Sequence, residues 1–170
     1  KSGWGNPDLS DRDRPLNKRG QRAAPAMAAW LKDQGYLPDM ALVSDARRTQ
    51  ETWALMDLGV PASFHAGLYL AEPSEILAHV AQTNAETVMV LAHNPGIGVL
   101  STELAAEWPK NERFIQFPTA SICVLRFDVA CGPVNLHRVA VIETLQQQGI
   151  PPKSSDLFFM DRPVRNVSCK

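Results

Sequence analysis

The sequence has few cysteines, almost no net charge and no long apolar run, and each shortage argues against a class of protein. Its three cysteines, Cys123, Cys131 and Cys169, are widely spaced, odd in number and without a C-x-x-C pair or a Cys/His cluster. This pattern disfavours a disulfide framework and a zinc site, and it favours a reducing, cytoplasmic location. A net charge of −1 argues against a global role on nucleic acid or a membrane surface, because both need a basic excess.

The longest apolar runs, such as Thr87 to Ala92, are far too short to span a bilayer. The first residues, KSGWGNP, are turn formers and do not resemble a signal peptide. What remains is a chain of 170 residues with 45% apolar and 21% charged residues, which is the composition of one soluble globular domain. Because the first residue is Lys1 and not Met, we expect the intact protein to contain residues upstream of it.

Helical and strand patterns alternate along most of the chain, which predicts an α/β fold with a mixed sheet. Helices are predicted over 17–34, over 47–58, from Pro73 and after Gly96, with Pro25 expected to kink the first helix or divide it into two pieces. Strands are predicted over 40–44, 63–65 and 87–92, and a final antiparallel hairpin over 120–127 and 135–142.

Periodicity is lost from residue 144 onward, where glutamines and prolines are typical of a linker or a surface wrap. We therefore expect one domain over residues 1–143 and a tail over 144–170 that packs on the same domain. The tail contains an apolar patch, Leu157 to Met160, which must dock on this fold or on a partner.

The first candidate functional residue is His93, which directly follows the apolar strand 87–92 and precedes a helix. Open α/β sheets bind ligands at the carboxyl ends of their strands, and a helix N-terminus favours an anion. An imidazole there could donate to a phosphate oxygen or transfer a proton. The alternative is a loop histidine whose ring bonds a backbone carbonyl.

A second candidate, Arg48, lies one residue inside the helix that follows the strand 40–44. A guanidinium group in this position would point toward the same crevice and could grip phosphate through two hydrogen bonds. The alternative is a solvated helix arginine that pairs with Glu51 or Asp45.

The third candidate feature is an excess of positive charge near the start of the chain. Residues 1–22 contain six basic side chains against three acidic ones: Lys1, Arg12, Arg14, Lys18, Arg19 and Arg22 against Asp8, Asp11 and Asp13. This excess could attract an anionic substrate, although a run of charges is also typical of a solvated surface.

Together and in this order, these segments resemble the histidine phosphatase superfamily, also called phosphoglycerate mutase-like, and within it the small phosphohistidine phosphatase-like branch. The resemblance covers roughly residues 1–142 and rests on KSGW at 1–4, Asp-x-x-Arg-Pro-Leu-Asn-x-Arg-Gly at 11–20, SDARRTQET at 44–52, LYLA at 68–71 and AHNPGI at 92–97. It implies a three-layer α/β/α fold, with a mixed, mostly parallel central sheet between helices.

The resemblance also implies a phosphatase that needs no metal or other cofactor. In that family an Arg-His motif supplies a histidine that takes the phosphoryl group, and water then releases phosphate. By position, Arg48 and His93 match the second arginine and second histidine that hold the phosphoryl oxygens, Asn94 is a further phosphate-binding candidate, and Glu72 is the nearest candidate for a general acid. The substrate would be a phosphorylated protein or a small molecule.

The chain departs from the family pattern at its start, because the Arg-His motif and its strand would lie immediately before Lys1. Gly5 stands where mutase-like relatives have a phosphate-binding asparagine, which argues against mutase activity. His65, His79 and His137 lie in unrelated contexts. Two functions therefore stay open: a phosphatase in the intact protein, or a non-catalytic phosphate- or partner-binding relative. An esterase is disfavoured, because the sequence has no G-x-S-x-G motif.

Overall fold

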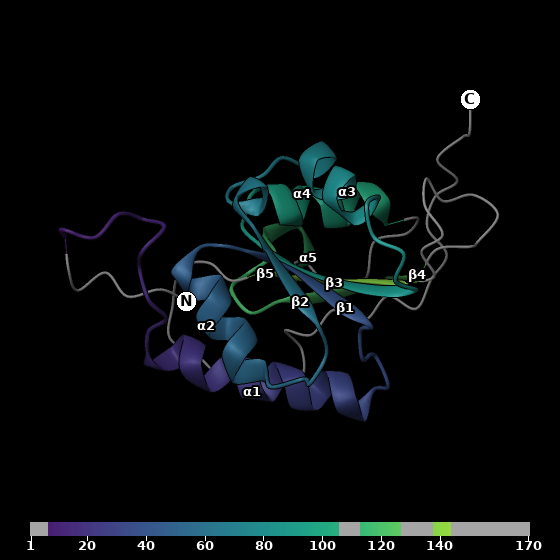
Figure 1. Cartoon of the computed structure of the whole chain (residues 1–170), viewed down its shortest axis with the longest axis horizontal. Coiled ribbons are helices and arrows are strands. Elements are labelled where there is room, and N and C mark those ends of the chain that lie inside the picture. Colours follow the sequence, from purple (N-terminus) through teal and green to yellow (C-terminus); the bar gives the residue numbers. More distant parts are fainter. Residues whose placement is uncertain (1–6, 106–112, 127–137, 144–170) are drawn as a thin grey trace.

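The computed structural model describes residues 7–105, 113–126 and 138–143, and Figure 1 shows their arrangement. The elements follow the order α1 Lys18–Asp33, β1 Met40–Ser44, α2 Arg47–Met56, β2 Ala62–His65, the 3-10 turn η1 Ala66–Leu68, α3 Pro73–Val80, β3 Thr87–Ala92, α4 Gly96–Leu104, α5 Arg113–Gln116, β4 Ile122–Arg126 and β5 Arg138–Glu143. The predicted α/β class is confirmed. No helix in the described ranges is long and apolar enough to cross a membrane.

The strands form a single five-stranded sheet in the order β2-β1-β3-β5-β4. All neighbours are parallel except β4 and β5, which form the predicted antiparallel pair. β3 lies in the middle, and its residues Val88 to Ala92 have no exposed surface, as expected for a strand covered on both faces. Because β1, β2 and β3 run in the same direction, their carboxyl ends meet at one edge of the sheet.

Helices cover both faces of this sheet, which confirms the three-layer arrangement. In Figure 1, α1 and α2 lie on one side of the strands, and α3 and α4 lie on the other. Each face has its own apolar core: Leu42 and Val90 pack with α3 and α4, whereas Val43 and Leu91 pack with α1 and α2. Successive residues of one strand point to opposite faces, so β1 and β3 contribute to both cores.

The first helix is continuous, so the expectation that Pro25 divides it is wrong. Helix α1 begins after Asn17, whose side-chain oxygen accepts the backbone N–H groups of Arg19 and Gly20, and it continues through Pro25 to Asp33. Pro25 and Gln21 are both exposed. The Gln21 carbonyl, which loses its helical donor at Pro25, therefore lies on the solvent side, where water can replace the missing bond.

Other predicted boundaries shift by one to three residues. α2 ends at Met56 and not at Leu58, because Asp57 adopts the left-handed conformation that ends helices. The turn η1 and the short helix α5 were not predicted, since three or four residues carry no periodic signal. The domain boundary at residue 143, the packing of the 144–170 tail and the Leu157–Met160 patch lie outside the described residues.

Gly96 brings the start of α4 against the segment before α3. A Cβ atom at Gly96 would lie 1.8 Å from the carbonyl oxygen of Ala71, which is far inside van der Waals contact. The neighbouring atom belongs to the backbone and cannot rotate away. The absence of a side chain at Gly96 therefore fixes how closely α4, and the His93 that precedes it, approach the loop at residues 69–72.

We predict that Gly96→Ala lowers the free energy of unfolding by about 3 kcal/mol or more, because the new methyl group overpacks a fixed backbone contact. Gly59→Ala is the matched control. Gly59 has a positive φ of 72° but open space around its Cβ position. Gly59→Ala should therefore cost only ~1–2 kcal/mol of backbone strain. Urea unfolding measures the loss of unfolding free energy in both variants. A loss for Gly96→Ala that is equal to or smaller than that for Gly59→Ala would contradict the close approach.

Candidate phosphate site

The structure brings Arg48 and His93 together at the carboxyl edge of the sheet. β1 ends at Ser44 and leads into α2, which carries Arg48, whereas β3 ends at Ala92 immediately before His93. Nη2 of Arg48 lies 3.1 Å from Nδ1 of His93. Both side chains are fully buried. Two segments that are 45 residues apart in the sequence thus bring a guanidinium and an imidazole into contact below the surface.

Arg48 does not pair with Glu51 or Asp45, so the solvated alternative is wrong. Its neighbour Arg47 pairs with Glu51 at 2.8 Å, and Arg12 pairs with Asp45 at 2.6 Å. The guanidinium of Arg48 points inward, where its Nε is buried without a hydrogen-bond partner among the described residues. Leaving such a donor unpaired costs ~1–3 kcal/mol, so this atom is available for an acceptor that the site could receive.

His93 bonds side chains and not a backbone carbonyl, which rules out the simpler alternative for its ring. Nε2 of His93 lies 2.7 Å from Oγ of Ser44, and Nδ1 faces Arg48. Burial and the Arg48 charge lower the pKa of His93 to about 3, so the ring is neutral near pH 7. Because a guanidinium can only donate, Nδ1 accepts from Arg48 and the ring proton is on Nε2.

The site contains an acid that was not assigned from the sequence, Asp11. Oδ2 of Asp11 accepts from Arg48 at 3.1 Å and from the Tyr69 hydroxyl at 2.7 Å, and Oδ1 accepts from Arg14 at 2.6 Å. Partial burial alone would raise the pKa of Asp11, but the Tyr69 hydrogen bond and the charges of Arg48 and Arg14 outweigh it and lower the pKa. The carboxylate is therefore an anion that is held by donors suited to phosphate.

Tyr69 contacts the cluster that Asp11, Arg48 and His93 form. Its ring stands edge-on to His93 with 5.3 Å between centroids, and the guanidinium carbons of Arg12 and Arg48 lie 5.1 Å and 5.7 Å from its centroid. Burial, followed by the hydrogen bond to Asp11, raises the pKa of the Tyr69 hydroxyl, so it remains a donor at neutral pH. The LYLA segment suggested a family resemblance, but nothing in its pattern placed this ring at Arg48.

The attraction of an anionic substrate by the basic residues near the start of the chain stays a prediction, and two of these residues are paired with acids. Arg12 and Arg14 are neutralised by Asp45 and Asp11, and Lys18 is exposed on α1. Lys1 lies outside the described residues. The loop instead brings Asp11 and Arg14 to Arg48, because the Arg48 guanidinium donates to the Asp11 carbonyl at 2.6 Å.

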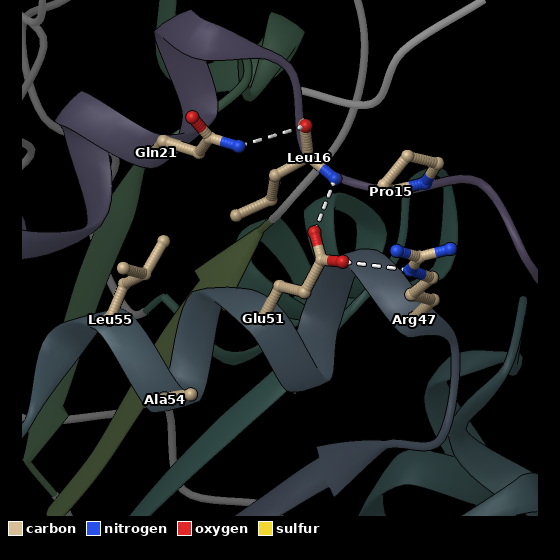
Figure 2. A pocket seen from close by; sticks show the side chains of 7 residues that line it. All are labelled: Pro15, Leu16, Gln21, Arg47, Glu51, Ala54 and Leu55. Atoms are coloured by element: carbon tan, nitrogen blue, oxygen red, sulfur yellow. Dashed lines mark hydrogen bonds and ion pairs between the residues drawn. The ribbon is translucent and has the colours of Figure 1, made fainter.

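A groove lies between α2 and the loop that precedes α1 (Figure 2), and the residues that line it include those that attach this loop to α2. The groove is lined by Pro15, Leu16, Gln21, Arg47, Glu51, Ala54 and Leu55. In the close-up, the Glu51 carboxylate accepts the Leu16 backbone N–H at 2.7 Å and the Nε–H of Arg47 at 2.8 Å. Glu51 therefore attaches the loop to α2, one turn of helix away from Arg48.

Glu72 and Asn94 are not joined to the Arg48–His93 pair. Glu72 is exposed at the start of α3, where its backbone N–H donates to the Glu75 carboxylate at 2.8 Å. The Asn94 amide donates to the Phe117 carbonyl at 2.9 Å. Among the described residues, neither side chain forms a hydrogen bond with Arg48 or His93, so their roles stay predictions.

The two other histidines that the structure describes, His65 and His79, lie away from this site. His65 and His79 pack their rings 4.7 Å apart at the end of β2, and His137 lies outside the described residues. Within the ranges that the structure describes, no three His, Cys, Asp or Glu side chains converge as they would around a metal ion.

No protein-family profile matches the chain, but it is similar to individual proteins. An uncharacterized protein of Mycobacterium tuberculosis is 34% identical over 125 residues, which cover 69% of this chain and 79% of the relative. An uncharacterized protein of Mycobacterium leprae is 29% identical over 128 residues, covering 71% of this chain and 80% of the relative. These relatives extend the sequence similarity but bring no known activity.

Solved structures give the family. The "putative phosphohistidine phosphatase SixA" of Agrobacterium tumefaciens has a TM-score of 0.55 and 30% identity, covering 59% of this chain and 68% of that one. Its counterpart from Nakamurella multipartitia has a TM-score of 0.56 and 35% identity, covering 59% of each chain. The chain thus spans less than two thirds of the Nakamurella protein.

The acid sensitivity of the fold should depend on His93. A base whose pKa is lower in the folded state than its ordinary 6.5 stabilises the fold above pH 6.5, and this stability is lost as the pH falls toward the folded value of about 3. At pH 5 we expect a loss of about 2 kcal/mol from this group. His93→Gln should remove that part of the pH dependence.

Urea unfolding at pH 7.5 and pH 5 measures the effect. His65 contributes with the same sign, because burial and the neighbouring His79 lower its pKa, so His65→Gln is the matched comparison. Asp11 loses its contribution only below its ordinary value of 3.8, because its pKa is lowered further in the fold. An unchanged difference between the two pH values in His93→Gln would contradict the buried neutral ring.

Proposed function

Since the chain belongs to the histidine phosphatase superfamily, we propose that the intact protein is a phosphatase that works through a phosphohistidine intermediate. The observation that carries the proposal is the buried pair of Arg48 and His93, with 3.1 Å between Nη2 and Nδ1. Few ligands other than an oxyanion suit an inward-facing guanidinium next to an imidazole. A cytoplasmic location stays a prediction.

The reaction would proceed in two displacements. A nitrogen of a nucleophilic histidine upstream of Lys1 attacks phosphorus, and the bond from phosphorus to the leaving group breaks. A water oxygen then attacks the phosphohistidine, its P–N bond breaks, and inorganic phosphate leaves. Arg48 would stabilise the charge that develops on the equatorial oxygens, which is the main catalytic task in phosphoryl transfer. The scheme needs no metal ion.

Asp11 must give way for a phosphoryl group to reach Arg48. Its carboxylate accepts from Arg48, Arg14 and Tyr69, and these are the donors that a phosphoryl oxygen would use. A bound phosphoryl group would take over the Arg48 bond and could also reach the unpaired Nε of the same side chain. In this proposal the carboxylate occupies the oxyanion position until the substrate arrives.

The proposed substrate is phosphohistidine or another small phosphorylated group. An imidazole leaving group departs without a strong acid, which suits a site where Glu72 forms no hydrogen bond with Arg48 or His93 among the described residues. Phosphorylated alcohols would need such an acid, because an alkoxide is a poor leaving group. Proteins or small molecules that carry phosphohistidine are therefore preferred over sugar phosphates.

A non-catalytic phosphate-binding function is the second candidate, because the buried Arg48 and His93 could hold an oxyanion with or without a nucleophile beside them. The two functions differ in a direct way. A phosphatase forms an acid-labile phosphoenzyme and releases phosphate, whereas a binding protein does neither.

In the intact protein, Arg48→Ala and His93→Ala should each lower kcat/KM for a phosphohistidine substrate by about 100-fold or more, because each removes a group that stabilises the transferring phosphoryl. Arg47→Ala and His79→Ala are the matched controls, since Arg47 pairs with Glu51 and His79 packs against His65. Phosphate release measures all four. Unchanged rates in both site variants would contradict the assignment, and activity that survives removal of the upstream histidine would contradict the phosphoenzyme.

Asp11→Asn should tighten the binding of inorganic phosphate to the intact protein by about 5-fold or more, because it removes a negative charge that competes for Arg48. Asp13→Asn is the control, since Asp13 is exposed and bonds only the nearby Ser10. Calorimetric titration measures the dissociation constant of inorganic phosphate for the wild type and both variants. Weaker binding by Asp11→Asn would mean that Asp11 orients Arg48 and does not compete with the ligand.

A further inference from the structure

Ser44 is held rigidly at the end of β1. Its side chain has no exposed surface, and its backbone lies in register with His65 of the neighbouring strand. Its carbonyl accepts the Thr49 hydroxyl at 2.8 Å, and its Oγ also lies 3.4 Å from the Ala46 backbone N–H. The position of its hydroxyl is therefore set by the sheet and by the turn into α2.

This hydroxyl contacts Nε2, the ring nitrogen of His93 that does not face Arg48. Oγ of Ser44 and Nε2 of His93 are 2.7 Å apart, whereas Nδ1 lies 3.1 Å from the Arg48 guanidinium. Since Arg48 can only donate, Nε2 must carry the hydrogen and Ser44 must accept it. Arg48 thus selects the Nε2–H tautomer of a ring that could otherwise protonate at either nitrogen. The Ser44 hydroxyl, which can accept or donate, supplies the acceptor for this hydrogen.

We propose that Ser44 is a positioning residue that holds the His93 ring in the Nε2–H tautomer, with Nδ1 facing the oxyanion site. This inference rests on the proposed function and deepens it. With Ser44 in place, Nδ1 can accept the hydrogen of a monoprotonated phosphoryl oxygen when Arg48 turns to the phosphoryl group. If the proton passes to the ring, Nδ1–H faces the phosphoryl oxygen and Nε2–H stays on Ser44, so the ring need not rotate.

The charged and titratable groups around the ring are compatible with this role. Arg48 of α2, Asp11 of the loop before α1 and Tyr69 after η1 face the ring or its partner Arg48. None of these groups has a hydrogen bond to Nε2, and within the described ranges Ser44 is the side chain that bonds this end of the ring. Removing the hydroxyl would leave a buried N–H without its acceptor.

The tautomer can be measured directly by long-range ¹H–¹⁵N correlation spectra of the isotopically labelled intact protein at pH 7.5. We expect the His93 ring to carry its proton on Nε2 in the wild type and in Ser44→Thr, which keeps a hydroxyl. With inorganic phosphate added to every variant, so that Arg48 can turn to the ligand, the ring of Ser44→Ala should populate both tautomers or move its proton to Nδ1. Ser101→Ala is the matched control, because Ser101 is equally buried but its hydroxyl donates to the Ile97 carbonyl; it should leave the ring unchanged.

Activity gives a second measure. In Ser44→Ala, kcat for phosphate release should fall about 10-fold or more with KM nearly unchanged, and the acid limb of the pH–rate profile should move; Ser44→Thr should restore both. A wild-type ring with its proton on Nδ1, or a Ser44→Ala protein with unchanged spectra, would overturn the proposal even if Ser44→Thr does not fold. An intact protein without phosphatase activity would reject the proposed function, and the spectra would still decide the role of Ser44.

Discussion

The arrangement of the site depends on one buried charge, the guanidinium of Arg48. A fully buried cation is costly unless it is paired and hydrogen-bonded, and here its partners come from three distant segments. The Asp11 carbonyl and carboxylate, the Nδ1 atom of His93 and the nearby Tyr69 ring all face it. The loop before α1, the turn after η1 and the end of β3 are thus brought together around the same group.

This charge also explains the states of its neighbours. Together with burial, it lowers the pKa of His93 to about 3, and it helps to keep Asp11 ionised. In the described site the Asp11 carboxylate occupies the position that we propose for an oxyanion, and one donor of Arg48, its Nε, has no partner among the described residues. In the proposed function, an incoming phosphoryl group would exchange one anion for another, so the buried Arg48 charge would stay paired.

The architecture around the site limits how far these groups can move. Gly96 lets α4 approach the backbone at Ala71, so that the segment carrying Tyr69 and the turn carrying His93 lie close together. Glu51 attaches the loop to α2 at Leu16. Neither residue touches the Arg48–His93 pair, yet both set its surroundings, and this separation of scaffold and chemistry is typical of sites built on rigid elements.

The sequence by itself determined the α/β class, the strands β1 and β3, the N-cap at Asn17 and the two strand ends where Arg48 and His93 lie, because these features rest on local periodicity, capping and strand-end position. Only the tertiary structure decided that Pro25 stays within one helix, that Arg48 pairs with Asp11 and not with Glu51, and that Ser44 and Tyr69 contact His93. Such pairings join residues far apart in the chain, and no local pattern records which buried donor meets which acceptor. The sequence pattern was enough to place Arg48 and His93 at one edge of the sheet, but their hydrogen-bond partners depend on how the distant segments pack together.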